Sequence, residues 1–250
     1  MGTVSVSLVR PLVAALPPER AARVLVASGV SADQLAEPEE RVTAAQFCVA
    51  WAEATRGERA LALRLAEQAP AGLFGVVEYV CRSAPTLRHA LGLWSRYLGL
   101  LDDAVRVGLV ATHGGAALRV LEESPAPAPA SHELCFALVL RHARGLVPRI
   151  DAVARFTHRV EDERPYRVYF EAVEFGAAHT ELWLSEASLD APLVTADPEL
   201  HTLLLATAEA RRDAAPYAAR VRRALVAAFA NGGRSEEHTS ELQSHSDLVC

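Results

Sequence analysis

Lysine is absent from this chain, and cysteine, methionine and aromatic residues are scarce. All 25 basic residues among the 250 are therefore arginines, and the formal net charge is −6. We attribute the missing lysine and the abundant alanine to GC-rich codon usage and infer no chemistry from them. The acidic balance argues against a protein that coats nucleic acid over its whole surface, although it is compatible with a local basic patch.

The four cysteines form no Cys-x-x-Cys pair, and three of them lie in apolar surroundings. At this length and spacing we expect buried thiols in a reducing cytoplasm rather than a disulfide framework. No stretch approaches the ~18 uninterrupted apolar residues of a membrane span. The N-terminus makes a poor signal peptide, since Arg10 and Pro11 interrupt its apolar run. The expected location is the cytoplasm, with no membrane partner.

Recognisable catalytic patterns are also missing. The chain contains no phosphate-cradling glycine loop, nucleophile elbow, metalloprotease helix or iron–sulfur spacing. An enzyme is therefore not the expected function.

The hydrophobic pattern changes its period along the chain. The clearest helical pattern is at residues 86–101, where apolar residues recur at i, i+3, i+4 and i+7. Alternation around His113-Gly114-Gly115 indicates a hairpin of residues 104–111 and 116–121. Further strands are predicted at 153–160 and 180–185, and further helices at 18–29, 32–35, 44–55, 58–69, 72–81, 131–147, 165–172, 198–212 and 218–229. The prediction is an α+β fold: a helical N-terminal half packed with a small, mostly antiparallel sheet, and closing helices.

Five residues are candidates for contacting a small ligand. Aromatic side chains with polar tips can line an apolar pocket, and charged or titratable groups beside apolar stretches can orient a polar ligand. Ordinary core packing is the simpler explanation of the aromatic residues, and exposed helix faces are the simpler explanation of the charged ones; the ligand-binding interpretation stays open beside both. The candidates are Tyr79, Trp94, Tyr97, Arg141 and His142.

Two further groups carry weaker signals. His132 and Cys135 are three apart on one predicted helix, which is compatible with a metal, but two ligands are too few and His142 lies too far along the helix to join them. We therefore predict no metal and no cofactor. An arginine cluster near the end of the chain could meet phosphate groups or be a solvated helix face; its DNA-proximal candidates are Arg220, Arg222 and Arg223.

Residues 234–250 differ in composition from the rest of the chain. They contain no alanine and four serines. The stretch from Arg234 to Ser244 can be encoded by a common sequencing-library adapter read in frame, which predicts a non-native tail. The alternative is a native polar tail. Segments of artificial origin are excluded from fold reasoning, so we expect the natural sequence to diverge at about Gly233.

The segment RSAPTLRHALGLWSRYLGLLDDAVRVGL, residues 82–109, resembles a block in the N-terminal domain of AraC-type transcriptional regulators. The resemblance is to the branch whose N-terminal part is called arabinose-binding-like. Residues 29–37, 41–55, 60–80 and 164–200 support it, including an Asp-x-Pro-Leu turn that begins at Asp190 and an Asp-Pro helix start at Asp197. One departure is Ala84, where a second serine is usual.

The resemblance implies a domain that senses a small-molecule effector and dimerises, followed by a C-terminal domain with two helix-turn-helix units that bind DNA. Residues 1–208 would be the sensing and dimerising domain. Residues 209–233 would be a linker and the first helix of a truncated DNA-binding domain, with the tail at 234–250. DNA would bind only to the full-length protein, and a homodimer is expected. The alternative is a stand-alone small-molecule or gas-sensing module without DNA binding.

Overall fold

The computed structural model describes residues 2–123 and 128–230, and side chains are described as far as residue 214. The chain divides into two compact units, residues 1–208 and residues 209–250. The first unit contains both sheets and the cavities described below. Among the described residues, no helix is both long and apolar enough to cross a membrane.

The N-terminal part is mainly helical, as predicted. Strand β1 (Thr3–Ser5) pairs antiparallel with β2 (Arg41–Thr43). Helices α1 (Val6–Ala14) and α4 (Ala44–Ala54) pack beside this pair, while α2 (Pro18–Ser28) packs on α4 and α1, and α3 (Ala32–Ala36) packs on α1. Ser31 and Thr43 each form a capping box with the glutamine three residues later, which fixes where α3 and α4 begin.

The next segment leads into the larger sheet. It contains α5 (Leu61–Gln68), α6 (Val76–Arg82), α7 (Leu87–Tyr97) and the 3₁₀ turn η1 (Leu98–Leu100). Thr86 caps α7 by accepting a hydrogen bond from the His89 N–H. The predicted helix at 86–101 is therefore confirmed, with its last turn tightened to a 3₁₀ geometry.

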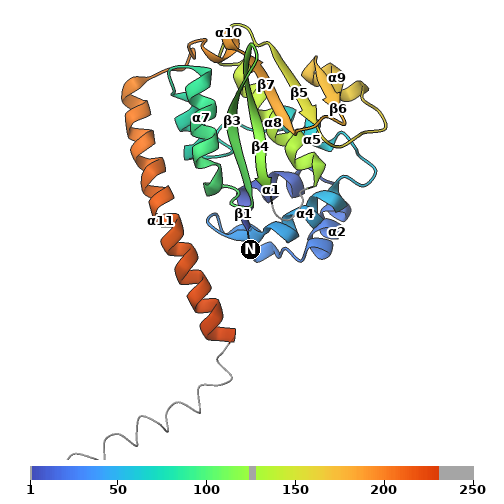
Figure 1. Cartoon of the computed structure of the whole chain (residues 1–250). Helices are drawn as coiled ribbons and strands as arrows, with labels where there is room; N and C mark the ends of the chain where they lie inside the picture. Colours follow the sequence, from blue (N-terminus) through green and yellow to red (C-terminus); the bar gives the residue numbers. More distant parts are fainter. Residues whose placement is uncertain (1, 124–127, 231–250) are drawn as a thin grey trace, which may run out of the picture. The chain divides into compact units, whose positions relative to one another are not determined.

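The larger sheet has five strands in the order β3-β4-β7-β5-β6. Strands β3 (Val105–Thr112) and β4 (Gly115–Glu123) form the predicted hairpin, and β7 (Glu181–Ser185) pairs antiparallel with β4 and with β5 (Ala152–Phe156). β6 (Val173–Phe175) pairs parallel with β5. The sheet is therefore mostly antiparallel, as expected, and the α+β prediction is confirmed (Figure 1).

The two faces of this sheet differ in chemistry, as the alternation of side chains along strands requires. Leu118, Leu182, Ala154 and Val173 are in register across four strands and are buried. One residue further along, the registered residues are charged and form a ladder of ion pairs of alternating sign: Arg119, Glu181, Arg155 and Glu174.

The remaining helices are α8 (Pro129–Arg144), α9 (Arg164–Phe170), α10 (Glu186–Leu189) and α11 (Pro198–Ala230). Two predictions need correction here. The closing helices predicted at 198–212 and 218–229 are one continuous helix, α11, because Pro216 lies in a long alanine- and arginine-rich run that keeps the helical conformation. The strand predicted at 153–160 ends at Phe156, and β6 was not predicted.

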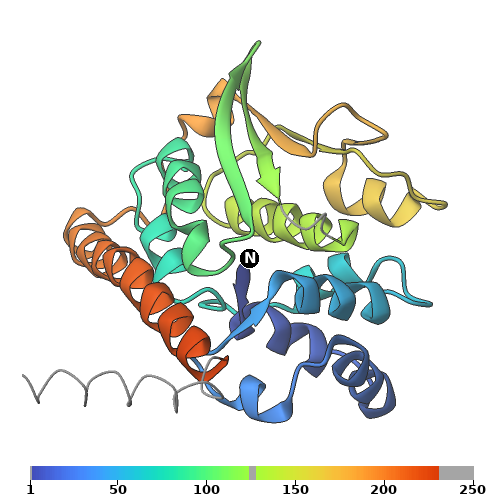
Figure 2. The same cartoon turned by 60° about the horizontal axis from the view of Figure 1, so that its bottom comes forward.

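Buried side chains form two hydrophobic clusters. The N-terminal cluster comes mainly from α1, α2, α4 and the start of α5 and includes Val4, Val9, Phe47 and Trp51. The sheet cluster includes Trp94, Leu118, Phe136, Phe156 and Leu182 and is formed by α5 to α8 and the strands. Figure 2 shows α1, α2 and α4 gathered beside the end of the hairpin where the chain enters β3.

Candidate functional site

A cavity of about 90 Å³ lies between the two hydrophobic clusters. Both clusters contribute to its wall, together with the first residues of β3 and the last residues of β4. The N-terminal cluster supplies Val4, Ala44, Phe47 and Trp51, and the sheet cluster supplies Phe74, Trp94, Leu98, Leu101, Val107, Phe136 and Leu138. This volume exceeds what several ordered water molecules need, while it is smaller than the ~300–1,000 Å³ of sites for drug-sized ligands.

Strand β1 holds the two sides of the cavity together. Besides its pairing with β2, it contacts the segment that leads into β3: the Ser5 N–H donates to the Leu101 carbonyl at 2.7 Å, and the Asp103 N–H donates to the Thr3 carbonyl at 3.0 Å. Val4 and Asp102 form an antiparallel bridge. These main-chain hydrogen bonds fix the position of Asp102 on the cavity wall.

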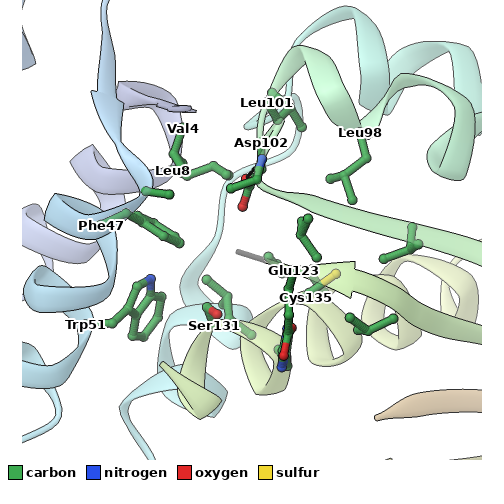
Figure 3. Close-up of a pocket in the computed structure, with 18 of the residues that line it drawn as sticks. Val4, Leu8, Phe47, Trp51, Leu98, Leu101, Asp102, Glu123, Ser131 and Cys135 are labelled. Carbon is green, nitrogen blue, oxygen red and sulfur yellow. Dashed lines mark hydrogen bonds and ion pairs between the residues drawn. The ribbon is translucent and has the colours of Figure 1, made fainter. Parts of the chain in front are cut away.

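Asp102 is a lining carboxylate with one oxygen that has no hydrogen-bond donor. Its Oδ1 accepts a hydrogen bond from the Ala104 N–H at 2.9 Å, and its Oδ2 accepts none from the described residues. Burial raises the pKa of Asp102, an effect that the Ala104 hydrogen bond opposes. Figure 3 shows the carboxyl group directed into the space between Phe47 and Trp51 on one side and Cys135 on the other.

The other polar groups on the wall are already engaged. His132 Nε2 lies 3.1 Å from Glu123 Oε2, at the end of β4 and the start of α8. The Ser131 hydroxyl donates to the Ala128 carbonyl at 2.8 Å. Among the described residues, Asp102 Oδ2 is therefore an acceptor that remains available to a ligand, and Glu123 keeps its second oxygen beside His132.

Two tryptophan N–H groups at the cavity have no acceptor. The Nε1 atoms of Trp51 and Trp94 are buried and lack a hydrogen-bond partner, and both side chains line the cavity. A buried donor without a partner costs about 1–3 kcal/mol, so such groups call for an explanation. The third tryptophan differs, since Trp183 Nε1 donates to Thr112 Oγ1 at 3.0 Å.

Cys135 lies in the apolar part of the cavity wall. Burial raises the pKa of its thiol to about 12, so the side chain is a neutral thiol there. The Trp94 indole slightly opposes this shift without making a regular hydrogen bond to the sulfur.

A smaller cavity of about 50 Å³ adjoins the first and shares Phe74, Trp94 and Leu138 with it. Glu78 is buried beside this space and accepts hydrogen bonds from the Gly72 N–H at 2.8 Å and the Phe74 N–H at 3.4 Å. The Phe74 and Trp94 rings meet edge to face at 5.4 Å and separate the two spaces.

The structure distributes the predicted ligand residues over several places. Trp94 lines both cavities, and His142 lines the smaller one. His142 Nε2 lies 3.9 Å from Glu78 Oε1. Arg141 donates to the carbonyls of two residues at the end of α5 and lines neither cavity. Tyr79 is 48% exposed and Tyr97 is fully buried in the core, and neither lines these cavities.

The weaker sequence signals have different outcomes. His132 and Cys135, considered as metal ligands, both line the larger cavity. No group of three or more His, Cys, Asp or Glu side chains suited to a metal occurs in the described part of the chain. Arg220, Arg222 and Arg223 lie on α11, but their side chains are outside the described residues, as are residues 231–250. Asp102 was not predicted, because nothing in its local sequence marks it.

These features define a class: an α+β domain with a mainly apolar cavity where two hydrophobic clusters meet. The sequence matches the family model described as the arabinose-binding domain of AraC transcription regulators, N-terminal, over residues 20–193. The chain therefore belongs to this family, whose domain is the ligand-binding regulatory part of a transcription regulator. None of the curated proteins matches the sequence.

A solved structure has a similar fold. It is the crystal structure of transcriptional regulator CdpR from Pseudomonas aeruginosa, with a TM-score of 0.54 and 20% sequence identity. The match covers 80% of this chain and 60% of that chain, so this chain spans less than two thirds of the regulator's length. At this identity the comparison shows the fold alone.

Proposed function

We propose that residues 1–208 are the effector-sensing domain of an AraC-type transcription factor, and that the effector binds in the cavity between the two hydrophobic clusters. The single observation that supports this most is the larger cavity itself: a mainly apolar space whose wall carries an available carboxylate oxygen of Asp102 and two tryptophan side chains whose buried N–H groups lack partners. Ligand sites are typically apolar with a few placed polar groups.

The location of the cavity suggests how binding would be transmitted. Its wall joins helices of the N-terminal cluster to the hairpin and α8 of the sheet cluster. A ligand that contacts both clusters favours the arrangement in which they are held together, and this difference in affinity is what shifts a regulator between states. In this proposal the domain has no catalytic role.

We further propose that residues 209–233 are the approach to a DNA-binding domain with two helix-turn-helix units, that residues 234–250 are a non-native tail, and that the domain forms a homodimer. Resequencing the gene across the codon for Gly233 tests the first two points. A continuing frame that encodes helix-turn-helix sequence supports them, while a genuine stop codon would favour a stand-alone sensing module. Light scattering tests the dimer.

A small-molecule screen by thermal denaturation tests the effector site. A ligand present at 100 times its Kd stabilises the protein by about 2.7 kcal/mol, so binding raises Tm. The same ligands are tested on Cys135→Leu, which places a larger side chain in the cavity. Ligands of this site shift Tm for the wild type and not for the variant; hits that shift both proteins equally would place the site elsewhere.

A further inference from the structure

The side chains that line the larger cavity also indicate the chemical class of its ligand. Among the described residues, no arginine lines it, whereas two carboxylates do: Asp102 and Glu123. Glu123 is paired with His132, and Asp102 Oδ2 has no partner. The nearby guanidinium of Arg41 donates to the carbonyls of Leu100 and Thr3 outside the cavity. An organic anion entering this space would meet two carboxylates, and the basic side chain on the wall, His132, is already paired with Glu123.

A sugar fits this wall poorly. Each buried hydroxyl group of a sugar needs hydrogen-bond partners, because a polar group transferred from water without one is destabilised. Of the polar lining groups, Glu123 and His132 bind each other and the Ser131 hydroxyl proton is donated to Ala128. The carboxylate oxygens left over accept hydrogen bonds and donate none, and the unpartnered N–H groups of Trp51 and Trp94 have almost no accessible surface. The hydroxyl oxygens of a sugar would therefore lack donors on this wall.

A cationic group fits well. Asp102 is held by its own main-chain N–H, which donates to the Leu98 carbonyl at 2.8 Å, by the bridge to Val4 and by the Ala104 N–H. Its free oxygen is therefore positioned before a ligand arrives, which lowers the cost of binding. The aromatic rings of Phe47 and Trp51 form the facing wall, and aromatic faces attract ammonium groups.

From this geometry we propose that the effector is a small apolar amine, whose ammonium group binds Asp102 and whose apolar body occupies the space between Phe47, Trp51 and Cys135 (Figure 3). This inference rests on the proposed function, since it assigns the chemical class of the ligand for the same cavity. It does not follow from the name of the family, which refers to a sugar.

Calorimetric titration of the whole chain with benzylamine, benzyl alcohol, benzoate and arabinose tests the proposal. Benzylamine, benzyl alcohol and benzoate share a benzene ring and differ in the polar group, and arabinose represents a sugar. Benzylamine is expected to bind about tenfold more tightly than benzyl alcohol, because a charge-assisted hydrogen bond to Asp102 replaces a neutral one. Benzoate and arabinose are expected to bind more weakly than both.

Asp102→Asn should weaken benzylamine binding about tenfold and leave benzyl alcohol binding nearly unchanged. The matched control is Asp103→Asn, because the Asp103 carboxylate accepts hydrogen bonds from the Thr3 N–H and hydroxyl outside the cavity. This variant should keep the affinity for benzylamine. Circular dichroism confirms that both variants are folded.

Tighter binding of benzoate or arabinose, or an Asp102→Asn variant with unchanged preference, would overturn the amine proposal. If benzyl alcohol binds and Cys135→Leu abolishes that binding, only the amine preference fails and the effector cavity stands. If none of the four compounds binds the wild type, both the amine proposal and the cavity site are overturned.

Discussion

Filling the larger cavity should stabilise the protein and remove its ligand site together. Cys135 lies on α8 at the cavity wall. Cys135→Leu adds apolar atoms to a mainly apolar cavity, at about 0.8 kcal/mol for each buried methylene group. The cavity volume limits how much stability can be gained by filling it. A volume of about 90 Å³ at roughly 24 cal/mol per Å³ corresponds to about 2 kcal/mol. We therefore expect a gain of about 1–2 kcal/mol.

Urea denaturation measures this change. The midpoint should rise with an unchanged m-value, because the same surface is exposed on unfolding. Thermal denaturation should show Tm raised by about 2–4 °C for each kcal/mol in a chain of this size. Cys135→Ala enlarges the cavity at the same position and should change stability in the opposite direction. Cys81→Leu is a second control, because it adds the same side chain beside the smaller cavity.

Overpacking gives the opposite result. If the space is not empty, a leucine at residue 135 forces neighbouring side chains out of their rotamers and costs about 1–3 kcal/mol. A Cys135→Leu protein that is less stable than the wild type by this amount, and that still binds cavity ligands, would refute the reasoning.

Three further predictions concern the framework of the domain. Gly115→Ala should lower stability by more than about 3 kcal/mol or abolish folding, because a Cβ there would lie 2.0 Å from the Leu184 carbonyl oxygen; soluble expression and urea denaturation check this. Arg141→Ala removes two hydrogen bonds to carbonyls at the end of α5 and should cost about 1–3 kcal/mol, whereas an unchanged urea midpoint would contradict it. Burial lowers the pKa of His142 in the folded protein. Below pH ~6.5 the imidazole is therefore protonated more readily in the unfolded chain than in the folded one, and the free energy of unfolding decreases as the pH is lowered. His142→Gln should reduce that loss between about pH 7 and pH 5, and equal losses in both proteins would exclude the effect.

The sequence was informative where structure is local. The helix at residues 86–101 and the hairpin around Gly114 follow from hydrophobic period and turn residues, and both are present. Strands β1, β2 and β6 have three residues each and exist through pairing with distant segments. No pattern within three residues identifies them. β6 follows α9, whose end is set by Glu171 with φ of 65°, and the prediction extended that helix too far.

The cavity shows the same limit more strongly. Trp94 was a candidate because an amphipathic helix placed it, and it lines the cavity. Asp102 and Trp51 were not candidates, because the cavity forms only when the N-terminal cluster meets the sheet cluster. Tyr79 and Arg141 share the residue types of a ligand site, but their helices orient them elsewhere.

The indole N–H signals of the three tryptophans give the most direct test of the effector cavity. Trp51 and Trp94 line it with unpartnered donors, while Trp183 donates to Thr112 and serves as an internal control. In a ¹H–¹⁵N spectrum of the labelled protein titrated with benzylamine, we predict that the indole signals of Trp51 and Trp94 shift and that the Trp183 signal stays in place. A titration in which only Trp183 responds, or in which benzylamine binds without moving Trp51 or Trp94, would contradict the proposed site.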